Sequence, residues 1–375
     1  MTARRGAALA LGAVLALGAA ACSGGPPPVL AASGGVLFDE GARRADLAGV
    51  APALLAKLCG VPRGDWGTHG VVRNVEGGGQ PGDTLARTLM EAGGAYLGRG
   101  DAGAREAILG NLDRWARGDA LAGVKGGDRV NAYYNLDRTL LPVIIAFWLV
   151  RDDPEAGASR VERIGDWLDD RVRWRLDDLQ DDLGDVSSRN NHRYLHDSVT
   201  MAWGALTGDP DLVAAGVESL DIALAQMRPD GSLPLETDRG RLALYYQRHA
   251  VGSLVTIAEM GAVQGLDLWS RTNDAGQTLH DAVRFLVAGI EDPGVVRPYT
   301  DAGQDLSFLG WRGHGRHYMA WAEAYLARFA GSPLAGRLER ALFGRGGAER
   351  PLVDDYAGGM TTCFYADPAR VAGGG

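Results

Sequence analysis

The chain has 375 residues and a formal net charge of −9, from 38 Lys and Arg against 47 Asp and Glu. An acidic protein does not attract a polyanion through its overall field, so nucleic acid is excluded as an expected partner and an acidic ligand would need a locally basic cleft. Hydrophobic residues make up 46% of the chain, enough to build a large core.

The N-terminus has the features of an export signal. Arg4 and Arg5 precede a short apolar run from Ala7 to Ala20, which is too short to span a membrane as a helix. Ala19-Ala20-Ala21-Cys22 resembles a lipoprotein cleavage site, and an ordinary cleaved signal peptide is the alternative. We therefore expect a signal peptide at 1–22, a flexible tether at 23–35 and one domain at 36–370, in a lipid-anchored periplasmic or outer-surface monomer.

Two cysteines remain in the expected domain, Cys59 and Cys363. In an oxidising compartment they could pair and join the two ends of the domain, but the sequence leaves this open. The sequence has no cysteine cluster of the kind that holds a structural zinc ion and no phosphate-binding glycine loop with its lysine. We expect no cofactor and no metal.

Helical periodicity dominates the remaining sequence. Apolar residues recur at three- and four-residue steps in 161–172, in 213–227 after the helix-opening pair Asp209-Pro210, and in 243–257 before Gly261. Further helices are expected at 84–98, 103–116, 137–151, 190–206, 276–290 and 316–330. Such a series forms either an open solenoid or a toroid of helical hairpins. The sequence lacks a repeat of fixed period, so we predict an all-α fold, an α/α toroid.

Two segments carry polar groups of the kind that catalysis uses. The first, Arg189-Asn190-Asn191-His192-Arg193-Tyr194, lies at an expected helix start, where backbone N–H groups favour an anion. The second runs from Asp230 through Gly231-Ser232-Leu233-Pro234-Leu235-Glu236 to Arg239 and Tyr246. If Arg239 and Tyr246 are both helical, their spacing of seven places them on one face. The plainer interpretation is a helix cap, a surface cation and a core aromatic residue.

These residue types suit β-elimination from a uronic acid. Removing the weakly acidic C5 proton builds negative charge beside a carboxylate, which cationic and amide groups must offset. A base then takes the proton and an acid protonates the departing O4. Asn, His and Arg suit the first task, and Tyr and His suit the other two.

Both segments resemble the signature regions of the alginate lyase family that degrades poly-β-D-mannuronate. The family pattern Asn-Asn-His-Ser-Tyr-Trp is similar to residues 190–195 here, and its Gly-x-Leu-Pro-x-Glu, Arg and Ala-Leu-x-Tyr pattern matches 231–236, Arg239 and 243–246. A weaker match, to Trp-Leu-Glu-Pro-Tyr, falls at Trp321-Ala322-Glu323-Ala324-Tyr325. The likeness extends over roughly residues 70–330, and the family fold is also an α/α toroid.

The resemblance implies roles at the matching positions. Asn191 and Arg239 would neutralise the substrate carboxylate, His192 would assist as neutraliser or base, and Tyr246 would be base, acid or both. The sequence departs from the family at Arg193, Leu195 and Gln247, and the stretch 71–79 that corresponds to the family's mobile lid has no tyrosine. These departures leave the preferred uronate open, with polyglucuronate as an alternative to alginate.

Other candidates are less tied to the motifs. We assign substrate contacts to Arg189, Tyr134, Arg138 and Trp321, although the sequence slightly favours a core role for the helix start around Tyr133, Tyr134 and Arg138. The glycine-rich stretch with Trp311, Arg312, His314 and His317 either closes over the cleft or forms a surface loop.

Three competing functions remain at this stage. His192 and His196 have the spacing of a zinc helix with Asp197 beside them, but Arg193 stands where a metalloprotease needs its Glu. A glycoside hydrolase would need two carboxylates, available from Asp197, Glu236 and Asp238. A non-catalytic glycan-binding lipoprotein would have little reason to combine Asn191 and His192 with Tyr246.

Overall fold

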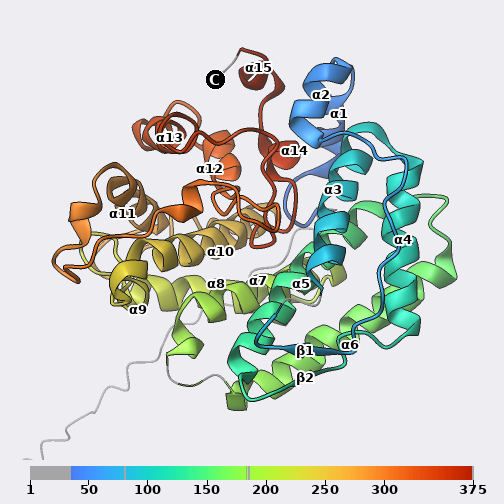
Figure 1. The fold of residues 1–375 in the computed structure, drawn as a ribbon, viewed down its shortest axis with the longest axis horizontal. Helices are drawn as coiled ribbons and strands as arrows, with labels where there is room; N and C mark the ends of the chain where they lie inside the picture. The colour runs from blue at the N-terminus through green and yellow to red at the C-terminus, as the bar shows by residue number, and fades with distance from the viewer. Residues whose placement is uncertain (1–34, 80–81, 183, 185, 374–375) are drawn as a thin grey trace, which may run out of the picture.

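The computed structural model describes residues 35–79, 82–182, 184 and 186–373 of the chain (Figure 1). The expected signal peptide and all of the expected tether except residue 35 lie outside this range. Within the described residues, no helix combines the length and the apolar character needed to cross a membrane.

The fold is almost entirely helical. The longer helices, in chain order, are α3 (Asp83–Arg99), α4 (Ala102–Arg117), α5 (Arg129–Val150), α6 (Ala158–Asp182), α7 (Asn191–Thr207), α8 (Pro210–Gln226), α10 (Ala243–Val263) and α11 (Leu279–Glu291). The shorter ones are α1 (Glu40–Leu47), α2 (Pro52–Cys59), α9 (Pro234–Thr237), α12 (Ala322–Arg328), α13 (Pro333–Glu339), α14 (Thr361–Tyr365) and α15 (Pro368–Ala372). Two three-residue strands, β1 (Asn74–Glu76) and β2 (Gly123–Lys125), pair in parallel with Asn74 opposite Gly123.

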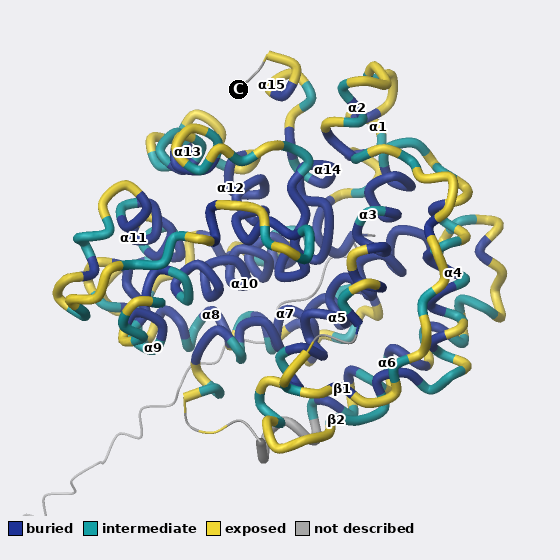
Figure 2. The backbone as a smooth tube through the Cα atoms, viewed as in Figure 1, coloured by how far each residue is buried: buried dark blue, intermediate teal, exposed yellow. Residues whose placement is uncertain are grey.

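The helices form an inner and an outer layer. Helices α3, α5, α7 and α10 pack side by side, and α4, α6 and α8 cover them from outside (Figure 1). Figure 2 shows α5, α7 and α10 buried along most of their length, while α4 and α6 alternate between buried and exposed positions. Apolar residues surround the inner helices on every side, as burial requires, whereas the outer helices are amphipathic.

Local sequence fixes the join between α7 and α8. Gly208 ends α7 with a φ of 74°, and its N–H bonds back to Gly204. Asp209 then caps α8 by accepting from the N–H groups of Asp211 and Leu212, with Pro210 in the first turn. The predicted start of this helix is confirmed. The two helices lie so close that a Cβ on Gly204 would come within 2.7 Å of Leu212.

The first and last helices of the described residues lie close together. Helices α12 and α14 carry the fold from α10 back to α2 and α3, and Figure 1 shows α14 beside α2 and α3. Cys59, which ends α2, forms a disulfide with Cys363 in α14, across a sequence separation of 304 residues. The pairing that the sequence left open is therefore present.

Some boundaries differ from the predictions. Helix α5 begins at Arg129, ahead of the predicted 137, because Asp128 caps it by accepting from the Asn131 N–H. Helix α10 continues past Gly261 to Val263, since burial against Leu268 outweighs the weak helix propensity of glycine. The predicted helix at 316–330 shrinks to α12, preceded by turns.

Candidate active site

The first motif forms the start of α7. The side chain of Asn190 caps the helix by accepting from the His192 N–H at 2.9 Å. Asn191 and His192 therefore occupy the first turn, as the sequence predicts. His192 is half-buried and its ring lies 4.2 Å from that of Tyr134 on α5, with 30° between the planes. Tyr134 thus joins the site through the ring of His192.

The second motif is a loop and short helix braced by α10. Gly231 has a φ of +92° and packs against the Asp281 carbonyl, where no Cβ would fit. The buried Gln247 side chain accepts from the Leu233 N–H at 3.0 Å and donates to the Gly231 carbonyl at 3.2 Å. Gln247, a departure from the family pattern, therefore fixes the loop that presents Glu236.

Glu236 ties the two motifs together. Its carboxylate accepts from the Asn191 backbone N–H at 2.7 Å and from the Asn191 Nδ2 at 2.9 Å. The Arg239 Nε lies 3.7 Å from the same carboxylate. Glu236 is completely buried and Asn191 is 1% exposed, whereas the Arg239 side chain is 28% exposed. Arg239 is therefore the accessible cation of this group, and Asn191 lies behind it.

Arg239 also contacts Tyr246. Its guanidinium carbon lies 4.1 Å from the centre of the Tyr246 ring, a cation–π contact. The pair meets although Arg239 is not helical, since it lies between α9 and α10 and Tyr246 lies in the first turns of α10. The predicted proximity is confirmed, and the predicted reason, a shared helix face, is wrong.

His249 and Tyr134 close the circuit. The His249 ring lies 5.5 Å from that of Tyr246, and its Nδ1 is 3.0 Å from the Tyr134 hydroxyl. Tyr134 in turn stacks on His192. Starting from Asn191, contacts run through Glu236, Arg239, Tyr246, His249 and Tyr134 to His192. We call this candidate set the catalytic circuit; its residues come from α5, α7, α9, α10 and the segment between α9 and α10.

Burial sets the charges within the circuit. Burial and the positive charge of Arg239 lower the pKa of His192 to about 4, so its imidazole is neutral near pH 7. Burial lowers the pKa of His249 well below its usual value, and the charges of Arg248 and Arg138 add to the effect. Burial raises the pKa of Glu236 to about 7, opposed by Arg239 and by the bonds from Asn191. The circuit thus holds one permanent cation and two neutral imidazoles near pH 7.

Two of the predicted substrate contacts are wrong. Trp321 is 1% exposed and packs against Gly252 of α10, so it belongs to the core. Arg138 is buried and its NH2 lies 2.9 Å from the Asp355 carboxylate, so its charge is already paired. Arg189 is exposed just before α7, where a polymer can reach it. Tyr133 is also buried, while its neighbour Tyr134 faces His192.

Three further arginines lie in or beside the two motifs, and each is either paired with a carboxylate or buried. They therefore add little positive charge for binding an acidic ligand. Arg193 bonds to Asp197 and, at 3.1 Å, to Glu218. Arg241 lies 3.0 Å from Asp305. Arg248 is completely buried, with its guanidinium carbon 4.4 Å from the centre of the Tyr318 ring.

The residues on which the competing functions would depend are buried or already paired. His196 is buried with its Nε2 3.2 Å from Arg175, a cation, and the described residues contain no group of three or more His, Cys, Asp or Glu able to hold a metal ion. Of the carboxylates that a hydrolase would need, Asp197 is buried and accepts from Ser219 at 2.7 Å, and Asp238 pairs with Arg228 at 2.8 Å. Glu236 is occupied by Asn191.

A small cavity of about 430 Å³ lies between the segment 77–79 and His314. Asn135, the residue after Tyr134, also lines this cavity. Its side-chain amide donates to the carbonyls of Glu76, Gly77 and Gly79 at 3.1, 3.3 and 2.6 Å. These bonds hold the segment that resembles the family's lid against α5. His314 lines the opposite side, and its Nε2 is 3.0 Å from the Tyr318 hydroxyl.

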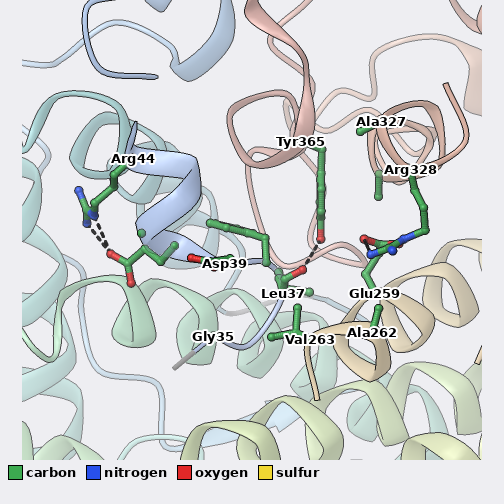
Figure 3. Close-up of a pocket in the computed structure, with 14 residues that line it drawn as sticks. Gly35, Leu37, Asp39, Arg44, Glu259, Ala262, Val263, Ala327, Arg328 and Tyr365 are labelled. Carbon is green, nitrogen blue, oxygen red and sulfur yellow. Dashed lines mark hydrogen bonds and ion pairs between the residues drawn. The ribbon is translucent and has the colours of Figure 1, made fainter. Parts of the chain in front are cut away.

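A cavity of about 800 Å³ lies elsewhere in the described residues. Figure 3 shows it between the segment before α1, the end of α10 and α12. The Glu259 carboxylate is held there by the Arg328 guanidinium at 2.5 and 2.9 Å, and the Tyr365 hydroxyl donates to the Leu37 carbonyl at 3.2 Å. None of the predicted site residues lines this cavity.

Sequence reasoning missed the supporting residues of the circuit. It treated Glu236 only as part of a motif or as a possible hydrolase carboxylate, and it did not use His249. The available signal for Glu236 was its position three residues before Arg239. His249 follows Tyr246 by three residues on one helix, a spacing that predicts neighbouring side chains.

Comparison with known proteins shows the family of the chain. The family model for alginate lyase matches residues 127–296, which include both motifs. A polysaccharide lyase of Stenotrophomonas maltophilia is 32% identical over 235 residues, which are 62% of this chain and 68% of that protein. The chain belongs to the alginate lyase family. An alginate lyase of Pseudomonas syringae pv. syringae is 32% identical over 144 residues, 38% of this chain and 36% of that enzyme.

The fold agreement covers more of the chain. Alginate lyase A1-III from Sphingomonas species A1 superposes with a TM-score of 0.72 at 23% identity, covering 88% of this chain and 95% of that one. The predicted α/α toroid is confirmed for this family member. As a member of the family, the protein is a polysaccharide lyase, and its chemistry is β-elimination.

Proposed function

We propose that this family member cleaves alginate, with polymannuronate the preferred block, by β-elimination at the catalytic circuit. The observation that supports this most directly is the meeting of Arg239, Tyr246 and His192 from two motifs that lie far apart in the sequence. The relatives named alginate lyase support the substrate.

Arg239 binds the uronate carboxylate in this proposal. It is partly exposed, and its guanidinium has donors beyond the Nε that bonds to the Leu235 carbonyl at 2.9 Å. As the C5 proton leaves, charge spreads into the carboxylate, and a fixed cation stabilises that charge more than it stabilises the ground state. The Asn191 amide behind Arg239, oriented by Glu236, adds a dipole to the same region.

Tyr246 and His192 handle the protons. The base takes the proton from C5, the C5–H electron pair forms the C4–C5 double bond, and the C4–O4 bond breaks. The departing O4 accepts a proton from the acid, leaving a 4,5-unsaturated uronate end. In β-D-mannuronate the C5 hydrogen and O4 lie on the same side of the ring, so Tyr246 can act as base and then as acid. Neutral His192 assists, because a bound carboxylate nearby would raise its pKa towards its usual value.

A panel of polyuronates tests the proposal. Incubation with polymannuronate, polyguluronate and polyglucuronate should give a product that absorbs in the near ultraviolet, fastest for polymannuronate. The same reaction in ¹⁸O-labelled water should incorporate no label, since elimination consumes no water. Cleavage with label incorporated and no absorbance would identify a hydrolase instead. Preference for polyglucuronate would overturn the substrate assignment.

We further infer that the protein is exported and lipid-anchored at Cys22. The disulfide between Cys59 and Cys363 supports an oxidising compartment. Expression in a bacterial host with labelled palmitate should label the wild type and leave a Cys22→Ala variant unlabelled in the soluble periplasmic fraction. Equal fractionation of the two would leave only an ordinary signal peptide.

A further inference from the structure

We propose that the rim of the toroid beside α3 carries a second binding site for the anionic polymer, built around Trp311, Arg63 and Arg87. We call it the rim site. The inference rests on the proposed function for the identity of the polymer, and it adds a place where the chain is held beyond the residues that react.

The rim site is a cavity of about 560 Å³ between the segment 60–63, helix α3, the turn at 311–315 and the segment 349–353. This volume lies within the roughly 300–1,000 Å³ of pockets that hold small ligands. It is separate from the cavity shown in Figure 3 and shares no lining residue with it.

Trp311 provides an apolar wall. Its side chain is 45% exposed, and among the described residues no other Trp or Phe is exposed. The indole ring of Trp311 contacts the ring of the buried His317 edge-on, with centroids 5.4 Å apart, and this contact supports its orientation. A rigid, exposed indole next to a cavity is a surface on which the apolar face of a sugar ring can pack.

Arg63 and Arg87 provide the charge. Both pair with the single carboxylate of Glu91, and their side chains remain 48% and 44% exposed. The single charge of Glu91 does not neutralise both guanidinium groups, so these three residues together are positive and only Glu349 opposes them. A guanidinium binds a ligand carboxylate through two parallel hydrogen bonds. Arg87 packs on Gly315, where a Cβ would lie 2.5 Å from the guanidinium carbon, so it borders the turn that carries Trp311.

Two other charges line the cavity. Arg350 is already paired with the buried Glu323, at 2.7 and 3.1 Å. Glu349 is exposed and would repel a polyanion. The rim site therefore contains charges of both signs. Removing a positive charge should weaken the binding of a polyanion, and removing the negative charge of Glu349 should strengthen it.

Helix α3 borders both the rim site and the small cavity beside His314. Asp83 lines the small cavity beside His314, and Arg87 and Glu91 line the rim site. These three positions are spaced by four residues, so they lie along one face of α3, over about 12 Å at 1.5 Å per residue. The turn at 311–315 contributes His314 to the small cavity and Gly315 to the rim site. A polymer that extends from the small cavity along α3 would reach Trp311, and Asn135, which lines the small cavity, follows Tyr134 of the catalytic circuit.

Comparing a long polymer with a short oligosaccharide as substrate separates the effect of the rim site from that of the catalytic circuit. Trp311→Ala and Arg87→Gln should each raise KM for polymannuronate about two- to tenfold, the effect of losing one contact of this size, while Glu349→Gln should lower it. For a short oligosaccharide that fills only the cleft, kcat and KM should stay at wild-type values in all three. The matched control is Arg271→Gln, whose side chain is also 44% exposed and pairs with Asp221 away from the cavity.

Binding without turnover keeps the test independent of the proposed function. In a Tyr246→Phe background, the three variants are compared by affinity electrophoresis in gels containing polymannuronate, polyglucuronate or a neutral glucan. The expected order, with Glu349→Gln tightest and Trp311→Ala and Arg87→Gln weakest, should hold only in the anionic gels. Unchanged mobility, equal effects on the short substrate, or weaker binding by Glu349→Gln would overturn the rim site. Failure of the wild type to form any unsaturated product would instead overturn the proposed function.

Discussion

Two histidines one turn apart on α7 have opposite surroundings. His192 is half-buried, stacks on Tyr134 and has its pKa lowered to about 4 by burial and by Arg239. His196 is enclosed, with Arg175 3.2 Å from its Nε2 and Asp197 3.7 Å away. Burial and the Arg175 charge hold its pKa well below the usual value.

The difference lies in what the neighbouring helices contribute. Near His192 the partners are Tyr134 of α5, which stacks on its ring, and Arg239 from the segment between α9 and α10, whose charge helps to lower its pKa. Around His196, α5 and α6 contribute Asp137 and Arg175, which form a buried ion pair. The i, i+4 spacing that suggested a zinc helix therefore joins a candidate catalytic residue to a structural one.

The largest effect is expected at Tyr246. Tyr246→Phe keeps the ring over which Arg239 lies but removes the proton-transfer group, so turnover should fall by at least about 10²–10⁴-fold while polymer binding survives. Absorbance assays and binding to immobilised polymer measure the two properties. Tyr245→Phe is the matched control, because the ring of Tyr245 also contacts Tyr246 and His249 but has Phe308, Tyr318 and the buried Arg248 as its other neighbours, not Arg239. Loss in the control alone would mean that the wrong tyrosine is assigned.

The two histidines should separate activity from stability. His192→Ala should lose most activity with little change in Tm, since the side chain is partly exposed. His196→Ala should lower the free energy of unfolding by about 1–3 kcal/mol, because it leaves a buried polar partner unsatisfied, with activity per folded molecule retained. Denaturant melts with parallel assays check both. The opposite assignment would overturn the comparison.

Glu236 should link pH to activity and stability. Burial raises its pKa to about 7 from an ordinary value of 4.5, so folding favours the protonated form. This contribution to stability is complete below about pH 4.5 and is lost as pH rises to about 7. Activity should change in the opposite direction, because only the ionised carboxylate accepts both Asn191 N–H groups.

Glu236→Gln should flatten both pH dependences and lower kcat about 10- to 100-fold, as expected for a lost charged hydrogen bond. Asp238→Asn, an exposed carboxylate paired with Arg228, is the control and should retain the wild-type profiles. A wild-type profile in Glu236→Gln would show that Glu236 does not orient Asn191.

The smallest effect on activity is expected at the disulfide. Replacing Cys59 and Cys363 together by Ser should cost about 2–4 kcal/mol of stability through the freed chain entropy, with the activity of the folded protein unchanged, since α2 and α14 lie apart from the catalytic circuit. Thermal melts and the absorbance assay test this. A large fall in kcat in the folded double variant would indicate that ring closure shapes the cleft.

Local sequence patterns predicted the helices and the two motifs. The burial and the partners of other side chains depend on contacts between distant segments, which the sequence does not show. Apolar periodicity and the Asp209-Pro210 pair suffice for α8, and the cap of Asn190 places His192. Sequence could not show that Trp321 points into the core or that Arg138 pairs with Asp355, 217 residues away. It also could not show that Gln247 braces the loop before Glu236, because each depends on packing between distant segments.

The most direct test of the central claim is the structure of the Tyr246→Phe variant with a bound mannuronate oligosaccharide. The account predicts a uronate carboxylate on the Arg239 guanidinium, with C5 and O4 of the same unit facing the ring at position 246 and the imidazole of His192. A carboxylate held away from Arg239, or a sugar whose C5 faces neither residue, would contradict it.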